Sequence, residues 1–443
     1  MEESVRLVKV EAYVGDNYYT IKEARAIELY TLEEQARIEK VIGEEREAYV
    51  QEVAYDRAFK QQNCTKCGHQ EGTWLGLAKW RWVWYAEAAG APLVLGFQAG
   101  RWQCQRCETS YTDYPLSVMA YSRHSVVMLY EMLEAMRKQS MAWVCRRYHI
   151  DEKTLSRMLL RQVEIRPDWE ALARQSALHL VVDEHSFAGK KLVITVCEAV
   201  TRQVLAILRD AKIATLKAFL KSIPRAVKKR IVYAATDLKE GYRTTLLGWK
   251  RSLIVSADPF HVVRLGNQLV EEERRMLQAD LRLKDREAHI PTGPLRAGGE
   301  RIKRRTRSWR NEILAAHPTL ECTYRLKEQL RAVYLARDPV QSPLLFERFE
   351  EDLRHAIDNP ALRSIRKDLK RFEGTLRRWR PHILAYFNTW LSTAIVEGFH
   401  TPIKLIKRIS FGFRNVERYR AKIMLGLGST IIIHRRPQQP LAA

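Results

Sequence analysis

The sequence predicts a multidomain protein whose largest part is an α/β domain, and three observations lead to this fold class. From Ser176 onward, short apolar strands alternate with helical segments, which is the pattern of a layered α/β sheet. Upstream lie two Cys-x-x-Cys pairs, followed by a segment that reads as two short helices around a tight turn. A length of 443 residues accommodates two or three such domains.

The charge of the chain indicates a nucleic-acid partner. Its net charge is +23 and its pI is near 9.8, and phosphate neutralisation requires this kind of excess of Lys and Arg. Residues 1–60 are the exception, with 9 basic against 14 acidic residues, so we do not expect this part to touch DNA. No apolar run approaches the roughly 18 residues of a membrane span, and the acidic N-terminus does not resemble a signal peptide. We therefore expect an intracellular protein without a membrane partner.

Residues 1–60 are predicted to be a lead-in of one strand and one acidic helix. The strand is expected over 5–10. Thr31 and Glu34 have the spacing of a capping box, so a helix is expected from Leu32 to about Lys60. Nothing in this segment indicates chemistry.

Residues 61–115 are predicted to be a zinc ribbon. Two Cys-x-x-Cys pairs are separated by 36 residues, and each pair offers two thiolates on one tight turn, as tetrahedral zinc prefers. The expected ligands are Cys64, Cys67, Cys104 and Cys107. In a reducing compartment such cysteines are metal ligands or core residues rather than disulfides. Four ligands fill the coordination sphere, so we expect one structural Zn²⁺ and a hairpin in the long intervening segment.

Residues 116–170 are predicted to be a helix-turn-helix DNA-binding domain. A helix over 125–137 precedes two short helices, over 140–148 and 152–163, and Asp151 is expected to cap the second of these. An ordinary helical pair is the alternative, and the basic charge of the chain favours DNA binding. The residues expected to read DNA at the start of the second helix are Lys153, Thr154, Ser156 and Arg157.

Residues 171–443 are predicted to be the catalytic domain, because three apolar strands each end in an aspartate. The strands are expected to end at Asp183, Asp237 and Asp258, with a turn over 187–190 after the first. Asp183 alone could simply cap that turn. Three such aspartates in one sheet are harder to explain in this way, since the ends of parallel strands meet at one edge, where ligands bind.

Two basic regions follow in the same domain. A basic helical insertion is expected over about 276–385, with Arg310, Trp309 and Trp379 in its charged clusters, and we interpret these clusters as surfaces that track a phosphate backbone. Further on, Glu397 leads into a basic segment. The residues of this segment expected to contact DNA are Lys404, Lys407, Arg408 and Arg414.

Taken together, these motifs resemble the DDE transposases of bacterial insertion sequences, specifically the zinc-ribbon-bearing ISL3 type. The resemblance covers roughly residues 60–430. Its most specific parts are Val182-Asp-Glu184, the run from Ser256 to Asn267, Val396-Glu-Gly398, and the segment from Ile403 to Asn415. It implies a ribonuclease-H-like catalytic core interrupted by helices, with Asp183, Asp237 and Glu397 as the catalytic triad.

Two features depart from the pattern of the family. Phe399-His-Thr-Pro402 replaces the usual polar run, and Pro402 is expected to kink α-helical structure or start a new helix close to Glu397. His185 lies beside the first aspartate, and we interpret it as a packing residue. Asp258 is expected to be auxiliary, orienting the metal shell or anchoring His261 and Arg264.

The resemblance also implies a mechanism and partners. Three carboxylates can hold two Mg²⁺ or Mn²⁺ ions about 3.5–4 Å apart and support in-line displacement at phosphorus, both for cleavage and for strand transfer. The partners would be terminal inverted repeats and target DNA, bound by at least a dimer because two DNA ends must meet. The location would be the bacterial cytoplasm, at the nucleoid. A transposase-derived DNA-binding regulator without catalysis and a ribonuclease-H-like nuclease remain alternatives.

Overall fold

The protein is described by a computed structural model over residues 19–21, 25–27, 30–43, 47–55, 57, 60, 63–88, 91–115, 117–119, 122–284, 289–428 and 430–434. The strand predicted over 5–10 lies outside these residues. The chain divides into two compact units, one formed by Met1–Pro167 with Pro402–Ala443 and the other by Asp168–Thr401. Within the described part of the chain, no helix is both long and apolar enough to cross a membrane.

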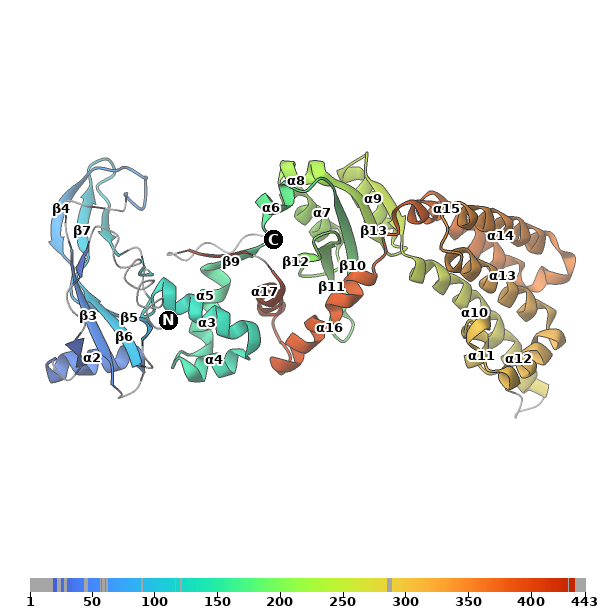
Figure 1. Ribbon diagram of the computed structural model, residues 1–443, viewed down its shortest axis with the longest axis horizontal. Helices are drawn as coiled ribbons and strands as arrows, with labels where there is room; N and C mark the ends of the chain where they lie inside the picture. Colours follow the sequence, from blue (N-terminus) through green and yellow to red (C-terminus); the bar gives the residue numbers. More distant parts are fainter. Residues whose placement is uncertain are drawn as a thin grey trace. The chain divides into compact units, whose positions relative to one another are not determined.

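A mixed five-stranded sheet organises the unit Asp168–Thr401 (Figure 1). Its strand order is β12-β11-β10-β13-β14. The strands are β10 (Leu178–Ala188), β11 (Lys191–Glu198), β12 (Gln203–Ile207), β13 (Ile231–Thr236) and β14 (Ile254–Ala257). The first three pair antiparallel, whereas β13 and β14 run parallel to β10. This confirms that the domain is α/β and places the ends of the parallel strands at one edge.

The prediction that the first strand ends at Asp183 was wrong. β10 continues to Ala188, because its antiparallel partner β11 stays paired along this length, and the turn follows at Gly189 with a φ of +55°. The parallel pairing of β10 with β13 does stop at Val182. Asp183 therefore lies within β10, level with the end of β13, rather than at the hairpin turn, and it does not cap that turn.

Four helices that precede or connect the strands bury one side of this sheet. They are α6 (Trp169–Ala173), α7 (Ile213–Ser222), α8 (Arg225–Arg230) and α9 (Glu240–Trp249). Leu216, Leu220 and Leu246 from these helices form one core with Val182 and Val255 of the strands. Burying apolar side chains of this size contributes about 1.5–3 kcal/mol each, so the sheet edge that carries the aspartates is firmly supported.

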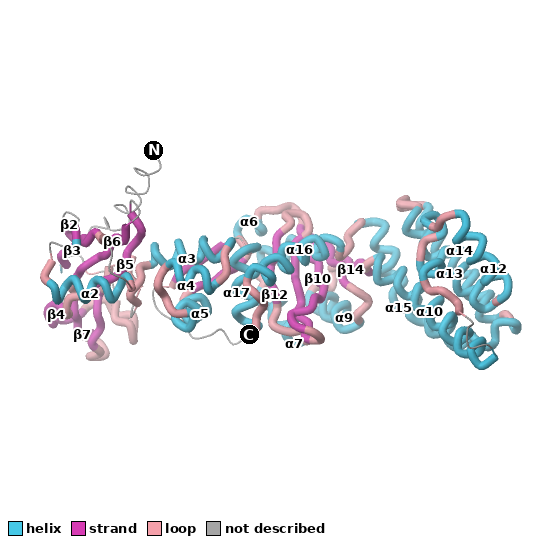
Figure 2. The backbone as a smooth tube through the Cα atoms, turned by 90° about the horizontal axis from the view of Figure 1, so that it is seen from below, coloured by secondary structure: helices cyan, strands magenta, loops and turns pink. Residues whose placement is uncertain are grey.

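The helical insertion begins earlier than predicted, directly after β14. It contains α10 (Pro259–Lys284), α11 (Gly293–Arg296), α12 (Arg304–Ala316), α13 (Pro318–Leu335), α14 (Gln341–Asp358) and α15 (Arg366–Thr389). α10 runs through the predicted start at 276 without a break, because it packs along α13, and α15 packs on β14 (Figure 2). Phe346, Phe349 and Phe387 lie in the core of this bundle, which also contains Ala257 at the end of β14.

The N-terminal part of the other unit consists of two small sheets. The first contains β1 (Tyr19–Ile21), β2 (Arg25–Ala26), β3 (Tyr49–Tyr55), β5 (Arg81–Ala88) and β6 (Ala91–Phe97), and the second β4 (Gly72–Leu77), β7 (Gly100–Cys104) and β8 (Ser110–Asp113). β5 and β6 form the hairpin predicted between the cysteine pairs, so that prediction is confirmed. β3 pairs with β6, so the segments predicted as lead-in and zinc ribbon share a sheet.

The acidic helix of the lead-in is shorter than predicted. The capping box of Thr31 and Glu34 is present, which confirms the start of α2 (Leu32–Ile42). The helix ends at Gly43, whose φ of +84° is left-handed, rather than continuing to Lys60. A Cβ at Gly43 would lie 2.5 Å from Cβ of His149, so glycine is required there for close packing as well as for conformation.

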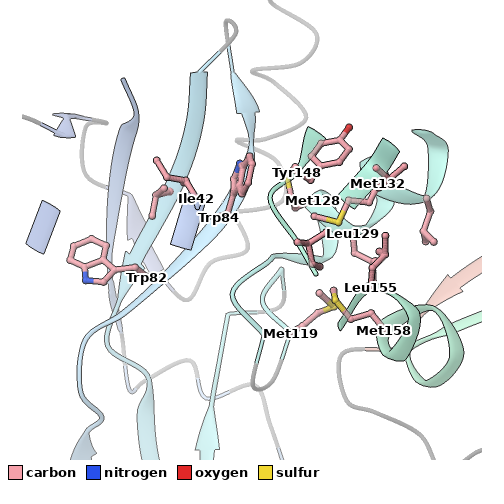
Figure 3. Close-up of a cluster of buried hydrophobic side chains, with 14 of the residues drawn as sticks. Ile42, Trp82, Trp84, Met119, Met128, Leu129, Met132, Tyr148, Leu155 and Met158 are labelled. Carbon is pink, nitrogen blue, oxygen red and sulfur yellow. The ribbon is translucent and has the colours of Figure 1, made fainter. Parts of the chain in front are cut away.

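Three helices follow in the same unit and share a core with the first sheet. They are α3 (Val126–Lys138), α4 (Met141–Arg147) and α5 (Glu152–Arg161). Asp151 accepts a hydrogen bond from the Thr154 N–H at 2.8 Å, so its predicted role as the cap of α5 is confirmed. Figure 3 shows the residues by which the sheet and the helices meet, among them Trp84, Met128 and Tyr148.

The C-terminal segment belongs to this unit rather than to the catalytic domain predicted over 171–443. α16 (Ala394–Ile409) runs through Pro402 without a new start. α17 (Val416–Leu427) packs against α3 and α5, and β15 (Thr430–Ile433) pairs with β9 (Val163–Arg166). Tyr419, Ile423 and Leu425 of α17 are fully buried in this unit, and this explains the different boundary.

A buried lysine in α17 predicts a pH dependence of stability. Lys422 is 3% exposed and donates to the Gln139 carbonyl at 2.7 Å, and burial lowers its pKa to about 8. Between pH 8 and 10.5 the unfolded chain therefore holds a proton that the folded chain has released, so this group adds stability as pH rises through that window, by up to about 3 kcal/mol. Denaturant unfolding at pH 7.5, 9 and 10 should show the increase in the native chain and lose most of it in Lys422→Met; an unchanged slope in the variant would contradict this.

Candidate functional site

Three aspartates form a row at the edge of the sheet. Val182 pairs with Thr236 in parallel register, and Thr236 pairs with Ala257, so Asp183, Asp237 and Asp258 follow at the same level of three neighbouring strands. Side chains in register on parallel strands point to the same face, and neighbouring strands lie about 4.8 Å apart. The Asp258 N–H also donates to the Thr236 carbonyl at 3.0 Å, which continues the pairing past the strand end.

Asp183 and Asp237 are carboxylates held out of water. Each is 8% exposed. Burial raises the pKa of Asp183 to about 6, and the charges of Asp237 and Asp258 add to this rise, while the Glu184 N–H and His261 oppose it. Burial also raises the pKa of Asp237, against the opposing charges of Lys239 and His261. A bound cation would relieve this unfavourable concentration of buried negative charge.

Asp258 is engaged differently, as an anchor. It is 2% exposed and contacts His261 Nδ1 at 3.0 Å with one oxygen, while the other accepts the Thr393 N–H at 2.9 Å. Burial acts to raise the pKa of Asp258, but the hydrogen bonds from His261 and Thr393 outweigh it and lower the pKa. The same bond raises the pKa of His261. Asp258 thus fixes both His261 and the start of α16.

Glu397 lies in the first turn of α16, and two contacts orient the face that carries it. Thr393, the residue before the helix, is bonded to Asp258, and His400 lies against His185, with ring centroids 5.1 Å apart. Residues 393, 397 and 400 are spaced by four and three positions, which places them on one face of a helix. His185 lies two residues after Asp183 on β10, and Thr195 Oγ1 holds its Nδ1 at 2.7 Å. Glu397 itself is exposed.

The three predicted catalytic carboxylates are not drawn together into one closed cluster. Among the described residues, the cysteine group is the sole set of three or more potential ligands with all ligand atoms within 4.8 Å of one another. The donor set still fits a hard divalent cation, because Asp183 and Asp237 offer buried carboxylate oxygens side by side and Glu397 lies on the face between two anchored contacts.

A second acidic group beside this row was not predicted from the sequence. Glu184 accepts a hydrogen bond from Tyr242 and pairs with Lys239, and its side chain is 9% exposed. Lys239 also lowers the pKa of Asp237. The available signal in the sequence was that Glu184 directly follows Asp183 and that Lys239 lies two residues after Asp237. Only the packing of α9 brings Tyr242 to Glu184.

The four predicted zinc ligands come together. The sulfur atoms of Cys64, Cys67, Cys104 and Cys107 all lie within 4.8 Å of one another. Cys64 and Cys107 are 3.5 Å apart at sulfur, as are Cys67 and Cys104. Tetrahedral zinc with bonds of about 2.3 Å to sulfur separates its ligands by about 3.8 Å, so the cluster fits one zinc ion.

Each cysteine pair lies in a turn of the same design, and this explains why the pairs match. In the first, the Cys64 N–H donates to the His69 carbonyl and the Gly68 N–H to the Cys64 carbonyl; in the second, Cys104 bonds Thr109 and Glu108 bonds Cys104 in the same way. Gly68 and Glu108 occupy the equivalent left-handed position, with φ of +73° and +55°. The first turn, with Cys64 and Cys67, precedes β4, and the second turn, with Cys104 and Cys107, follows from the end of β7.

Only some of the residues predicted to contact DNA from α5 are exposed to solvent. Lys153 and Arg157 are exposed in the first two turns of α5, and Arg157 donates to Thr154 Oγ1 at 3.2 Å. Ser156 is 4% exposed, because it lies on the inner face of α5 beside Leu155.

The predicted basic segments contain both exposed and buried residues. In the C-terminal segment, Lys404, Arg408 and Arg414 are exposed and Lys407 is half-buried. In the insertion, Arg310 is buried and donates to Tyr324 Oη at 2.7 Å, and Trp379 is 2% exposed in the helical core. The interpretation of these two residues as part of a phosphate-tracking surface was therefore wrong.

Comparison with known proteins gives consistent matches. A family of transposases, the ISL3-type DDE family, matches residues 180–423. The transposase for insertion sequence element IS1001 of Bordetella parapertussis is 26% identical over 276 residues, which cover 61% of this chain and 65% of that protein. The transposase for insertion sequence element IS1557 of Mycobacterium tuberculosis is 26% identical over 246 residues, or 48% of this chain and 52% of that protein. The chain thus spans between half and two thirds of the length of these curated relatives.

Proposed function

This chain belongs to the ISL3-type family of DDE transposases, and from that membership we propose that it is the transposase of an insertion sequence, which cleaves DNA at the ends of the element and transfers the strands. The catalytic domain would be ribonuclease-H-like. The mixed sheet supports this assignment, because three antiparallel strands are followed by two parallel strands on one side, in the order β12-β11-β10-β13-β14.

The observation that carries the proposal is the row of aspartates. Asp183 lies on β10 level with Asp237, which directly follows β13, and both are buried with raised pKa values, so their position and electrostatics suit cation binding rather than turn capping. Glu397 would complete the triad from α16. When bound, two Mg²⁺ or Mn²⁺ ions would stabilise the attacking and leaving oxygens at the scissile phosphate.

The neighbouring residues would position this triad. Asp258 holds His261 in front of the row and fixes the start of α16 through Thr393, so it would set the approach of Glu397 without touching the reacting atoms. The carboxylates would supply acceptor oxygens only. No residue of the chain would form a covalent bond to DNA, because water or a 3′-hydroxyl serves as the nucleophile in this chemistry.

The remaining parts would recognise DNA. The cysteine cluster would hold one structural Zn²⁺, and the pair α4 and α5 would act as a helix-turn-helix with Lys153, Thr154 and Arg157 facing DNA. Lys404, Lys407, Arg408 and Arg414 would contact the phosphate backbone, and Ser156 would contribute only to packing. The partners would be terminal inverted repeats and target DNA, with at least two copies per complex, acting on nucleoid DNA in the bacterial cytoplasm.

A nicking assay tests this function. Purified protein is incubated with a supercoiled plasmid that carries the gene's own flanking DNA, with Mg²⁺, Mn²⁺ or EDTA, and the nicks are mapped. We expect metal-dependent cuts at the repeat ends and their loss in Glu397→Gln. The control Glu417→Gln, which removes a carboxylate from the first turn of α17, should retain the cuts. Tight binding to the ends without cleavage would instead identify a regulator, and metal-dependent cuts that ignore the ends would identify a nuclease.

A further inference from the structure

A basic pocket lies at the end of the sheet opposite the aspartates. α8 ends at Arg230, immediately before β13 starts at Ile231, and α9 ends at Trp249, shortly before β14. The end of α7, α8 and the end of α9 line a pocket of ≈ 560 Å³ at this place. Its apolar lining comes from Leu220, Ile223 and Trp249. The pocket therefore opens at the amino ends of the strands whose carboxyl ends carry the aspartates.

The charge around this pocket has one sign. Residues 211–236 contain seven Lys and Arg and no Asp or Glu. The pocket is lined by Lys221, Arg225, Lys228, Lys229 and Lys250, and no acidic residue lines it. Among the described residues, no ion pair neutralises the first four of these side chains, and Lys221, Arg225 and Lys229 are exposed. Such an arrangement concentrates positive potential at an open, concave surface.

The fifth basic residue of the pocket, Lys250, bonds the backbone at the end of α8. Lys250 Nζ donates to the carbonyls of Lys228, Lys229 and Ile231, at 3.0, 3.1 and 2.6 Å, and thereby caps the end of α8. Lys228 extends over the Trp249 ring, with its Nζ 4.9 Å from the ring centroid. The walls are thus fixed by internal contacts, while the remaining cations stay available to a ligand.

We propose that this pocket is a docking site for the phosphodiester backbone of DNA, separate from the catalytic row. The proposal rests on the proposed function, because it assigns a second contact on the same substrate. The six residues of β13 separate the pocket from Asp237 by about 20 Å at roughly 3.3 Å per residue.

Charge complementarity selects this occupant. Several cations without ion-pair partners around an open concave surface are the arrangement by which proteins contact the phosphates of a DNA backbone. Contacts to phosphates carry no sequence information, so the pocket would hold any DNA sequence and would fix the position of the duplex rather than select it.

Lysine footprinting tests the site directly. The protein is acetylated without divalent metal, alone or with a 40-base-pair duplex of gene-flanking DNA, and modification is quantified by mass spectrometry. We expect DNA to protect Lys221, Lys228 and Lys229, and an unrelated duplex to protect them equally. Unchanged modification of these lysines while DNA is bound would overturn the proposal. Equal protection by polyglutamate would also overturn it, because an acidic polypeptide would then be as good an occupant.

A matched pair of variants gives an independent measure. Arg225→Gln, Lys228→Gln and Lys229→Gln together should weaken binding to all sequences and lower the slope of log K against log salt by about 3, one for each lost phosphate contact. The control is Arg325→Gln, Arg348→Gln and Arg354→Gln, which removes the same charge from α13 and α14, where acidic residues are interspersed. An equal loss of slope in both variants would show a general charge effect and refute the site.

These results separate this proposal from the one before it. Metal-dependent nicking at the repeat ends with unprotected pocket lysines would refute the pocket alone. Protected lysines in a protein that never nicks DNA would refute the transposase activity alone.

Discussion

Asp237→Asn is expected to lower the rate of metal-dependent DNA cleavage by about 10³-fold, which corresponds to about 4 kcal/mol in the activation free energy. Asp183→Asn should do the same. Each change removes one negative charge from the paired carboxylates at the sheet edge and leaves the shape of the side chain unchanged. The rate of nicking of the flanking-DNA plasmid measures the loss, and binding of the same DNA should stay within a few-fold of the native value.

A second readout distinguishes a metal-binding role from a structural one. Because burial raises the pKa of Asp183 to about 6, its ionised form destabilises the metal-free fold at pH 7, and Asp183→Asn should stabilise that form by up to about 3 kcal/mol. The stabilisation by Asp183→Asn should vanish below about pH 4, where Asp183 is protonated in both the folded and the unfolded native chain. Asp210→Asn is the control, since Asp210 lies at the start of α7 and bonds Thr215. Loss of both activity and stability in Asp183→Asn would contradict the proposed role.

Cys104→Ser is expected to abolish zinc binding and unfold the module around the cysteines. The native chain should contain one zinc ion, measured by elemental analysis, and the variant none. Apparent binding energies of structural zinc are about 10–16 kcal/mol, and the loss of one thiolate removes enough of this to release the ion. The core beneath the site is too small to hold the fold, as it contains little beyond Trp102, Tyr111 and the cysteines themselves.

The control for this prediction is a cysteine outside the cluster. Cys145 is half-buried against the helical core and lies apart from the zinc ligands, so Cys145→Ser should retain one zinc ion and its thermal transition. EDTA should unfold the native chain's zinc module in the same way as Cys104→Ser. A variant Cys104→Ser that keeps one zinc ion per chain would contradict the assignment.

Local signals in the sequence were sufficient for several features. The four cysteines could be predicted because each pair lies within one tight turn, whose geometry depends on six neighbouring residues. The starts of α2 and α5 follow from Thr31 with Glu34 and from Asp151, since a capping side chain bonds N–H groups only three residues away. The strands that carry the aspartates were recognisable from their apolar runs, because such a run is also a signal within a few neighbouring residues.

Other features depend on parts of the chain far apart in sequence. That β10 continues past Asp183 is decided by its pairing with β11, and that β13 stops there is decided by the helical connection. The orientation of side chains around a helix likewise depends on what packs on it. Ser156, Arg310 and Trp379 are polar or basic-region residues by sequence, yet each faces inward because a neighbouring element covers it.

Contacts within a few residues in sequence are thus sufficient to predict the pairing of the cysteines in two turns, the helix starts and the aspartates that follow apolar strands. By contrast, three features follow from the packing of distant segments: the aspartates lie in one row, Asp258 bonds both His261 and the start of α16, and Lys239 and Tyr242 contact Glu184. The physical reason is that strand register and helix packing depend on contacts between distant segments, which no local pattern encodes.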